Sequence, residues 1–196
     1  MKYDRTTRWL HAGLALTVVI QLLSSLLMVV PHPGRVPTEP GYTLFHIHRW
    51  SGITVVGLLL LHWLWQLSGH LSNGWGHLFP WFSARRMQRL MDDLKALPGW
   101  LRNGFPDQSK ETLPMAGAIH GLGLLAVTGM ALTGGTIFFA MGPDGGMVPW
   151  VHTVAEIHSL IAGFMWAYLF GHAGIAIVHQ FRESPLITDM FNLARK

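Results

Sequence analysis

The chain has 196 residues, of which 50% are apolar, and it carries only 14 Lys and Arg and 10 Asp and Glu. Such a composition is typical of an integral membrane protein and argues against a soluble domain. The absence of Cys excludes disulfides, iron–sulfur clusters, thiolate ligands and thioether-linked haem. The formal charge of +4 says little about nucleic acid, which we do not expect as a partner, because membrane topology governs where these charges lie.

Four apolar segments each reach the roughly 20 residues that a helix needs to cross a bilayer. They predict an all-α membrane protein with four transmembrane helices, which form a single membrane domain over residues 1–196. The first segment is too long for the apolar part of a signal peptide and no A-x-A cleavage site follows it, so we expect it to be retained. The predicted spans cover residues 9–30, 44–68, 114–140 and 150–181, with a long loop over 69–113.

The basic residues are divided unequally between the two sides of the membrane. Only Arg35 and Arg49 fall on one side. The positive-inside rule therefore predicts that both termini and the 69–113 loop are cytoplasmic. The basic residues on the cytoplasmic side are Lys2, Arg5, Arg8, Arg85, Arg86, Arg89, Lys95, Arg102, Lys110, Arg182, Arg195 and Lys196.

The long cytoplasmic loop contains the pattern of a short amphipathic helix. Ser83 can cap a helix from Ala84 to about Leu97, and Pro98-Gly99 should end it. A helix of this kind can lie on the membrane surface, held by anionic lipid. The alternative is a docking surface for a soluble redox partner. The apolar face would consist of Met87, Leu90, Met91, Leu94 and Leu97.

The third span is rich in glycine. Within it, Gly117-x-x-x-Gly121 has the spacing of a motif that lets membrane helices approach closely. We expect helix packing to account for most of these glycines, and some of them to leave room for a flat macrocycle.

The fourth span holds two histidines, His158 and His172, fourteen residues apart in an otherwise apolar segment. Fourteen residues of α-helix rise about 21 Å and turn through about 1400°, which is within about 40° of whole turns. Both rings therefore share one face, one near each end of the hydrocarbon layer. Polar side chains are costly in a membrane, so the pair predicts a function, and holding two stacked haems by axial nitrogens fits this spacing.

Each haem needs a second histidine at the same depth. For His158 the spacing favours His48, because Gly52 lies one turn further on the same face and leaves space for a porphyrin. For His172 there are two candidates at the inner depth. His11 opens the first span, and His62 follows His48 by fourteen residues. Spacing alone does not decide between them.

Three stretches carry a family resemblance: Arg8-Trp9-Leu10-His11, His48-Arg-Trp-Ser-Gly52, and the segment from His158 to His179. With these the chain resembles the bacterial cytochrome b561 family, which is similar to the membrane cytochrome b subunits of nickel–iron hydrogenases and formate dehydrogenases. The resemblance covers essentially the whole chain and implies a four-helix bundle in the bacterial inner membrane with two b haems.

The resemblance also implies the ligands. His48 and His158 would bind the outer haem iron, and His11 and His172 the inner one. In the family the position of His62 is often an arginine, so this chain departs from the pattern there. We expect His62 to contact a haem propionate or a quinone. His120, His179 and Arg49 are weaker candidates for the same contacts, and an interfacial position is the alternative for His179.

Bis-histidine ligation leaves no open position on iron, which favours electron transfer and predicts no catalytic residue. With the quinone that the family resemblance implies, the expected function is a dihaem b cytochrome. It would carry electrons between the quinone pool, ubiquinone or menaquinone, and a redox partner or partner enzyme subunit. The alternative is a self-contained superoxide:quinone oxidoreductase, in which Arg35 and Arg49 attract the anion to the outer haem. Membrane lipid is the remaining expected partner.

Overall fold

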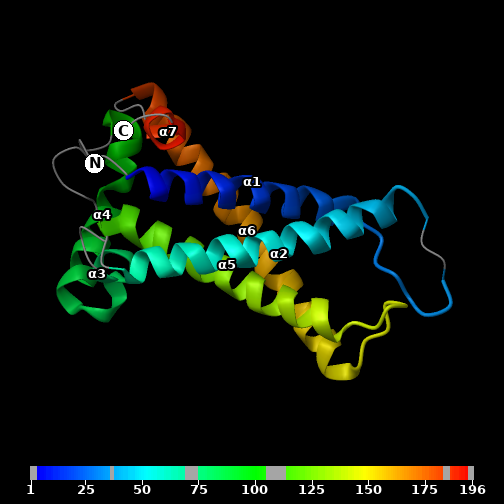
Figure 1. Ribbon diagram of the computed structural model, residues 1–196. Coiled ribbons are helices and arrows are strands. Elements are labelled where there is room, and N and C mark those ends of the chain that lie inside the picture. The colour runs from blue at the N-terminus through cyan, green and yellow to red at the C-terminus, as the bar shows by residue number, and fades with distance from the viewer. Residues whose placement is uncertain (1–3, 36–37, 69–74, 105–113, 183–185, 194–196) are drawn as a thin grey trace. The chain divides into compact units, whose positions relative to one another are not determined.

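The computed structural model describes residues 4–35, 38–68, 75–104, 114–182 and 186–193, and these residues form helices and connecting turns without a β-sheet (Figure 1). The elements in chain order are α1 (Arg5–Leu27), α2 (Gly41–Leu67), α3 (Trp75–Leu78), the 3₁₀ turn η1 (Pro80–Phe82), α4 (Ala84–Asn103), α5 (Pro114–Ala140), α6 (Pro149–Arg182) and α7 (Leu186–Phe191).

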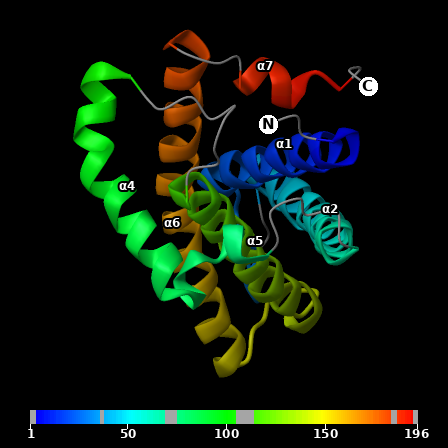
Figure 2. The ribbon, with the colours of Figure 1, turned by 90° about the vertical axis from the view of Figure 1, so that its left-hand side faces the viewer.

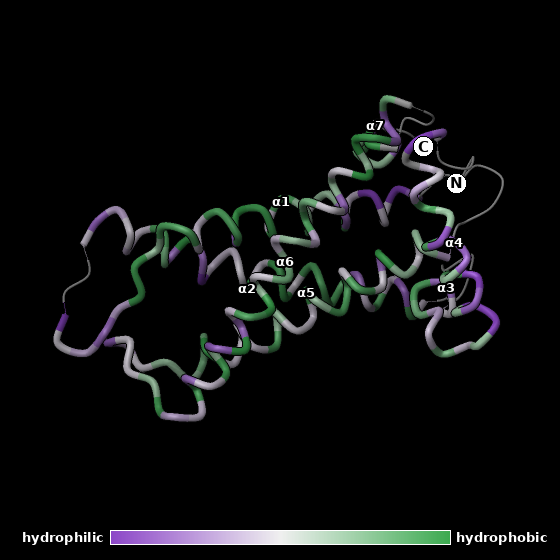
Figure 3. The backbone as a smooth tube through the Cα atoms, turned by 180° about the vertical axis from the view of Figure 1, so that it is seen from behind, coloured by the Kyte–Doolittle hydropathy of each residue, from purple (hydrophilic) through white to green (hydrophobic). Residues whose placement is uncertain are grey.

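Four of these helices, α1, α2, α5 and α6, are long and apolar enough to cross a membrane. This confirms the prediction of an all-α protein with four such helices. Hydrophobic residues predominate along them (Figure 3), and Leu16, Leu132 and Phe170 leave 63%, 68% and 69% of their surface exposed. So large an apolar surface suits lipid, where the backbone must satisfy its own hydrogen bonds as a helix does.

Hydroxyl groups in the long helices bond to the backbone of their own helix. The Thr17 hydroxyl donates to the Gly13 carbonyl at 2.8 Å, and the Thr133 hydroxyl donates to the Gly129 carbonyl at 2.7 Å. The Ser51 hydroxyl donates to Ile47 in the same way at 2.6 Å. A bond of this kind satisfies a polar group without water, so these residues are tolerated in an apolar helix.

The chain divides into two compact units, and each of the four long helices contributes to both. Unit 1 comprises Met1–Trp9, Leu64–Leu125 and Tyr168–Lys196, and unit 2 comprises Leu10–Trp63 and Ala126–Ala167.

Unit 2 is held together by close helix contacts. A Cβ at Gly13 of α1 would lie 3.2 Å from the Leu58 side chain of α2, so the two helices approach closely there. The Trp63 indole N–H of α2 donates to the Thr128 hydroxyl of α5 at 3.2 Å. These contacts fix the parts of α1, α2 and α5 that surround the candidate site.

In unit 1 the short helix α3 packs against α5 (Figure 2), at the glycine motif formed by Gly117 and Gly121. A Cβ at Gly117 would overlap the His77 carbonyl oxygen, and a Cβ at Gly121 would overlap the Leu78 carbonyl oxygen. The motif therefore admits the backbone of a short connecting helix. Burial at this contact lowers the pKa of the His77 imidazole, because it disfavours the charged ring.

Helix α4 begins at Ala84, as the sequence predicts, but it lacks the predicted cap and ends later than predicted. Ser83 precedes its first residue, but its side chain makes no capping hydrogen bond. The expected end at Pro98-Gly99 is wrong, because α4 continues to Asn103. A proline removes one backbone hydrogen bond, and the turns on either side keep theirs. The helix ends at Gly104, whose φ of 106° favours glycine.

Polar contacts of unit 1 secure the helix ends. The Asp93 carboxylate of α4 accepts the Met115 N–H at the start of α5, at 3.0 Å. The buried Arg8 side chain of α1 donates to the Asn192 carbonyl at 2.7 Å. The Gln180 side-chain oxygen of α6 accepts the Ile187 N–H of α7 at 3.0 Å. These bonds satisfy backbone groups that a helix end leaves unpaired.

Candidate functional site

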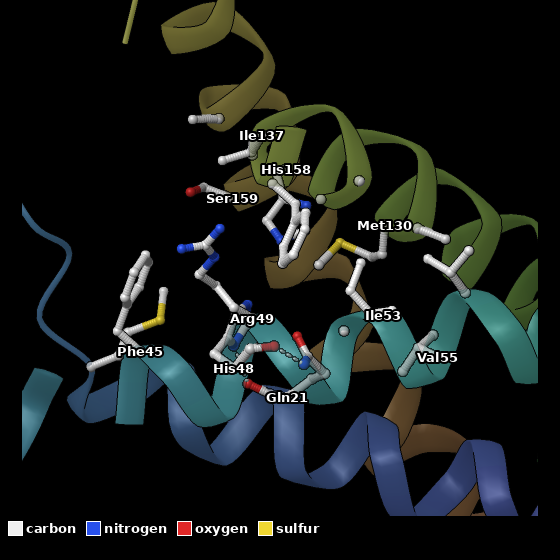
Figure 4. Close-up of a pocket in the computed structure, with 18 of the residues that line it drawn as sticks. Gln21, Phe45, His48, Arg49, Ile53, Val55, Met130, Ile137, His158 and Ser159 are labelled. Atoms are coloured by element: carbon white, nitrogen blue, oxygen red, sulfur yellow. Dashed lines mark hydrogen bonds between the residues drawn. The ribbon is translucent and has the colours of Figure 1, made fainter. Parts of the chain in front are cut away.

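Unit 2 contains a cavity of about 230 Å³ that α1, α2, α5 and α6 line (Figure 4). Most of the lining is apolar, with methionine, valine and isoleucine side chains. The polar side chains in the lining are Gln21, His48, Arg49, His158 and Ser159. Apolar walls with a few convergent polar groups are typical of a cofactor site.

His48 of α2 and His158 of α6 face each other across this cavity. Their ring centres are 6.4 Å apart, and the ring planes make an angle of 82°. The structure thus brings together the two histidines that the sequence predicts as an outer pair. The two residues lie far apart in the sequence, on different helices. Their proximity is therefore produced by the packing of α2 and α6 and not by the geometry of a single helix.

The hydrogen bonds of His48 fix its tautomer. Its Nδ1 lies 3.1 Å from the Gln21 carbonyl oxygen and 3.2 Å from the Ser24 hydroxyl oxygen. A carbonyl oxygen only accepts, so Nδ1 carries the proton. The Ser24 hydroxyl donates to the same Gln21 carbonyl at 3.0 Å and therefore also accepts from His48. Nε2 of His48 is left with its lone pair, which is the form that binds a metal.

His158 is held in the same way by α5. Its Nδ1 lies 2.8 Å from the Thr133 hydroxyl oxygen. Because the Thr133 hydroxyl already donates to the Gly129 carbonyl, it accepts the Nδ1 proton of His158. Nε2 of His158 is therefore the nitrogen with the lone pair. Gly134 makes room for the ring, since a Cβ there would lie 3.0 Å from its Cε1 atom.

A family comparison covers almost the whole chain. The family model for prokaryotic cytochrome b561 matches residues 2–193. The chain belongs to this family. Family membership makes it a membrane protein that binds b-type haem and transfers electrons. A search of curated proteins and a search of solved structures gave no match.

The residues around the cavity of this cytochrome fit a haem. Two imidazoles that bind one metal ion from opposite sides have ring centres about 6 Å apart, since each nitrogen lies about 2 Å from the metal and about 1 Å from its ring centre. The 6.4 Å between His48 and His158 agrees with this. Histidines that bind metals also donate their other ring N–H to a protein oxygen, as both do here.

The residues that orient the two histidines are not evident from histidine spacing. Gln21, Ser24 and Thr133 come from α1 and α5, which do not supply the facing rings. The signal available in the sequence is a polar side chain inside an apolar span, which usually has a partner. Gly52, expected to leave space for a porphyrin, lines the cavity, where a Cβ would meet the Gln21 side chain at 3.4 Å.

His172 lies in unit 1, in a cluster of rings. Its ring centre is 5.5 Å from that of His120 on α5, with the planes at 74°, and it stacks on Tyr168 at 5.4 Å. A Cβ at Gly123 would overlap the Tyr168 hydroxyl, so the helix approach there is close. The structure therefore brings His120 to His172, two residues that the sequence analysis did not pair.

His11 and His62 are both half-buried in unit 2, on α1 and α2 respectively. The predicted partner of either is His172 of unit 1, and that pairing stays a prediction. His179 of α6 is buried, with 3% of its surface exposed. Over the described part of the chain, no group of three or more His, Asp or Glu side chains is arranged to hold a metal ion.

Proposed function

We propose that the protein is a dihaem b cytochrome that carries electrons across the membrane between the quinone pool and a redox partner or partner enzyme subunit. The observation that carries the proposal is the pair His48 and His158, 6.4 Å apart, with both Nδ1 atoms held by protein oxygens. These two residues would bind the outer haem iron, and His11 and His172 would bind the inner one.

The bound haem would supply an iron that takes up and releases one electron. The chain's own residues would bind and orient this haem. Gln21, Ser24 and Thr133 hold the two imidazoles in one tautomer, which leaves Nε2 of each ring able to bind the haem iron. Two histidine ligands leave no site for an exogenous ligand, which limits the cofactor to electron transfer. The apolar lining would limit the access of water to the bound haem.

We place the quinone contact at the ring cluster of unit 1. An imidazole N–H or a phenol O–H can donate to a quinone carbonyl, and His120 and Tyr168 supply such groups beside His172. His62 and His179 are further candidates for a contact with a quinone or a haem propionate. Ubiquinone and menaquinone both present carbonyl oxygens to these donors.

The expected topology places both termini and the 69–113 loop in the cytoplasm of a bacterium, with the four spans in its inner membrane. Helix α4 would lie on the membrane surface, since the exposed Met91 and Leu94 lie on one face of the helix and the exposed Arg85 and Arg89 on the other. The chain has no native Cys, so a maleimide can label only an introduced one. A membrane-impermeant maleimide applied to whole cells should label Val148→Cys, which is predicted on the outer side, and spare Asn103→Cys, which is predicted in the cytoplasm. The reverse pattern would overturn this topology.

Haem content tests the function and the choice of inner ligand together. The purified protein should show two b haems per chain in a reduced-minus-oxidised spectrum, and quinol should reduce them. His11→Ala should lose one haem, whereas His62→Ala should keep both. Loss of a haem only in His62→Ala would transfer the inner ligand to His62, and a wild-type spectrum without a Soret band would refute the proposed function.

A further inference from the structure

Arg49 is the one cationic side chain among the residues that line the cavity. It follows His48 on α2, and its guanidinium lies 4.5 Å from the ring centre of Phe138 and 5.7 Å from that of Phe45. Figure 4 shows it near His48, in the space that the cavity residues surround. Its contacts are thus with aromatic faces, which attract a cation but leave its five N–H donors available.

The cavity offers Arg49 no counter-ion. None of its lining residues is Asp or Glu. Across the described ranges, the ion pair that the structure contains is Lys95 with Asp92 on α4. A cation in apolar surroundings is costly unless an anion or several acceptors compensate it. An anion bound in the cavity would supply the negative charge that the lining lacks.

We infer that Arg49 forms an anion subsite of this cavity, fitted to a carboxylate. The planar guanidinium presents paired N–H groups that match a carboxylate in two parallel hydrogen bonds. A ring face that contacts the plane of the guanidinium, as Phe138 does, leaves the N–H groups at its edge for that ligand. The inference rests on the proposed function, because haem b carries two propionate carboxylates. A free anion that enters the cavity, such as superoxide, presents the same charge.

The position of Arg49 also gives it an electrostatic effect. A fixed positive charge near the histidine pair favours the reduced, more negative state of a redox centre held there. Removal of that charge should therefore lower the reduction potential of the outer haem and leave the inner one unchanged.

The test compares Arg49→Gln and Arg49→Lys with Arg85→Gln, a control that removes an exposed cation of α4 that is absent from the cavity lining. For each purified holoprotein we would measure the haem-to-protein ratio, the release rate of haem to an acceptor protein, and both reduction potentials. If Arg49 binds a propionate, Arg49→Gln should release one haem about tenfold faster, with a lower potential for that haem alone. Arg49→Lys should restore the potential but not the slow release.

The rate at which superoxide reduces the outer haem distinguishes a free anion from a haem propionate as the ligand of Arg49. If Arg49 binds a free anion, haem release should match the wild type while reduction of the outer haem by superoxide falls about tenfold. The inference is overturned if the haem release rate, both potentials and the superoxide rate in Arg49→Gln equal those of Arg85→Gln and of the wild type. A wild-type protein without haem would instead refute the proposed function, so the two failures are distinguishable.

Discussion

His158→Ala should remove one of the two haems and leave the other in place. The variant loses the Nε2 that faces His48 across the cavity, and a haem held by one remaining histidine would dissociate during purification. The haem-to-protein ratio should fall to about half of the wild-type value. When the reduced-minus-oxidised spectrum is followed as a function of applied potential, one of the two reduction potentials should be missing. His48→Ala should give the same result, because both residues would serve the same iron.

Two histidines on the same helices provide matched controls for this pair. His152 is exposed on α6, six residues before His158, and His46 lies on α2 in contact with the Tyr42 ring at 4.6 Å. Their alanine variants should keep both haems. A His158→Ala protein that retains two haems, or a His46→Ala protein that loses one, would contradict the assignment of His48 and His158.

Gly121→Ala should destabilise the protein. The added Cβ would overlap the carbonyl oxygen of Leu78, which is backbone and cannot rotate away as a side chain would. Overpacking of this kind costs about 2 kcal/mol, which should lower the thermal midpoint by roughly 4–8 °C for a chain of this size. Thermal unfolding followed by circular dichroism in detergent measures the shift.

The control for this variant is Gly171→Ala on α6, where an added Cβ would have no neighbour within 4 Å. Alanine favours a helix over glycine by about 1 kcal/mol, so this variant should be as stable as the wild type or slightly more stable. Equal midpoints for Gly121→Ala and Gly171→Ala would mean that α3 does not pack on α5 as the structure shows.

Local regularities of the sequence account for the helices and for part of the site. A bilayer requires about 20 consecutive apolar residues per helix, so composition alone revealed four spans. The 3.6-residue repeat of the α-helix was enough to predict that His158 and His172 share one face, and no information on neighbouring helices was needed. Local rules failed at Pro98, where helical turns on both sides outweighed the loss of one hydrogen bond and Gly104 ended the helix.

The sequence by itself thus determined the membrane helices, the family and the histidines that could hold haem, because each of these can be recognised from short stretches of the chain without knowledge of how they pack. Only the tertiary structure decided which partners orient the rings: Gln21 and Ser24 for His48, and Thr133 for His158. It also showed that α3 occupies the glycine motif of α5. Those contacts join separate helices, and contacts between distant segments leave no periodic pattern in the sequence from which to predict them.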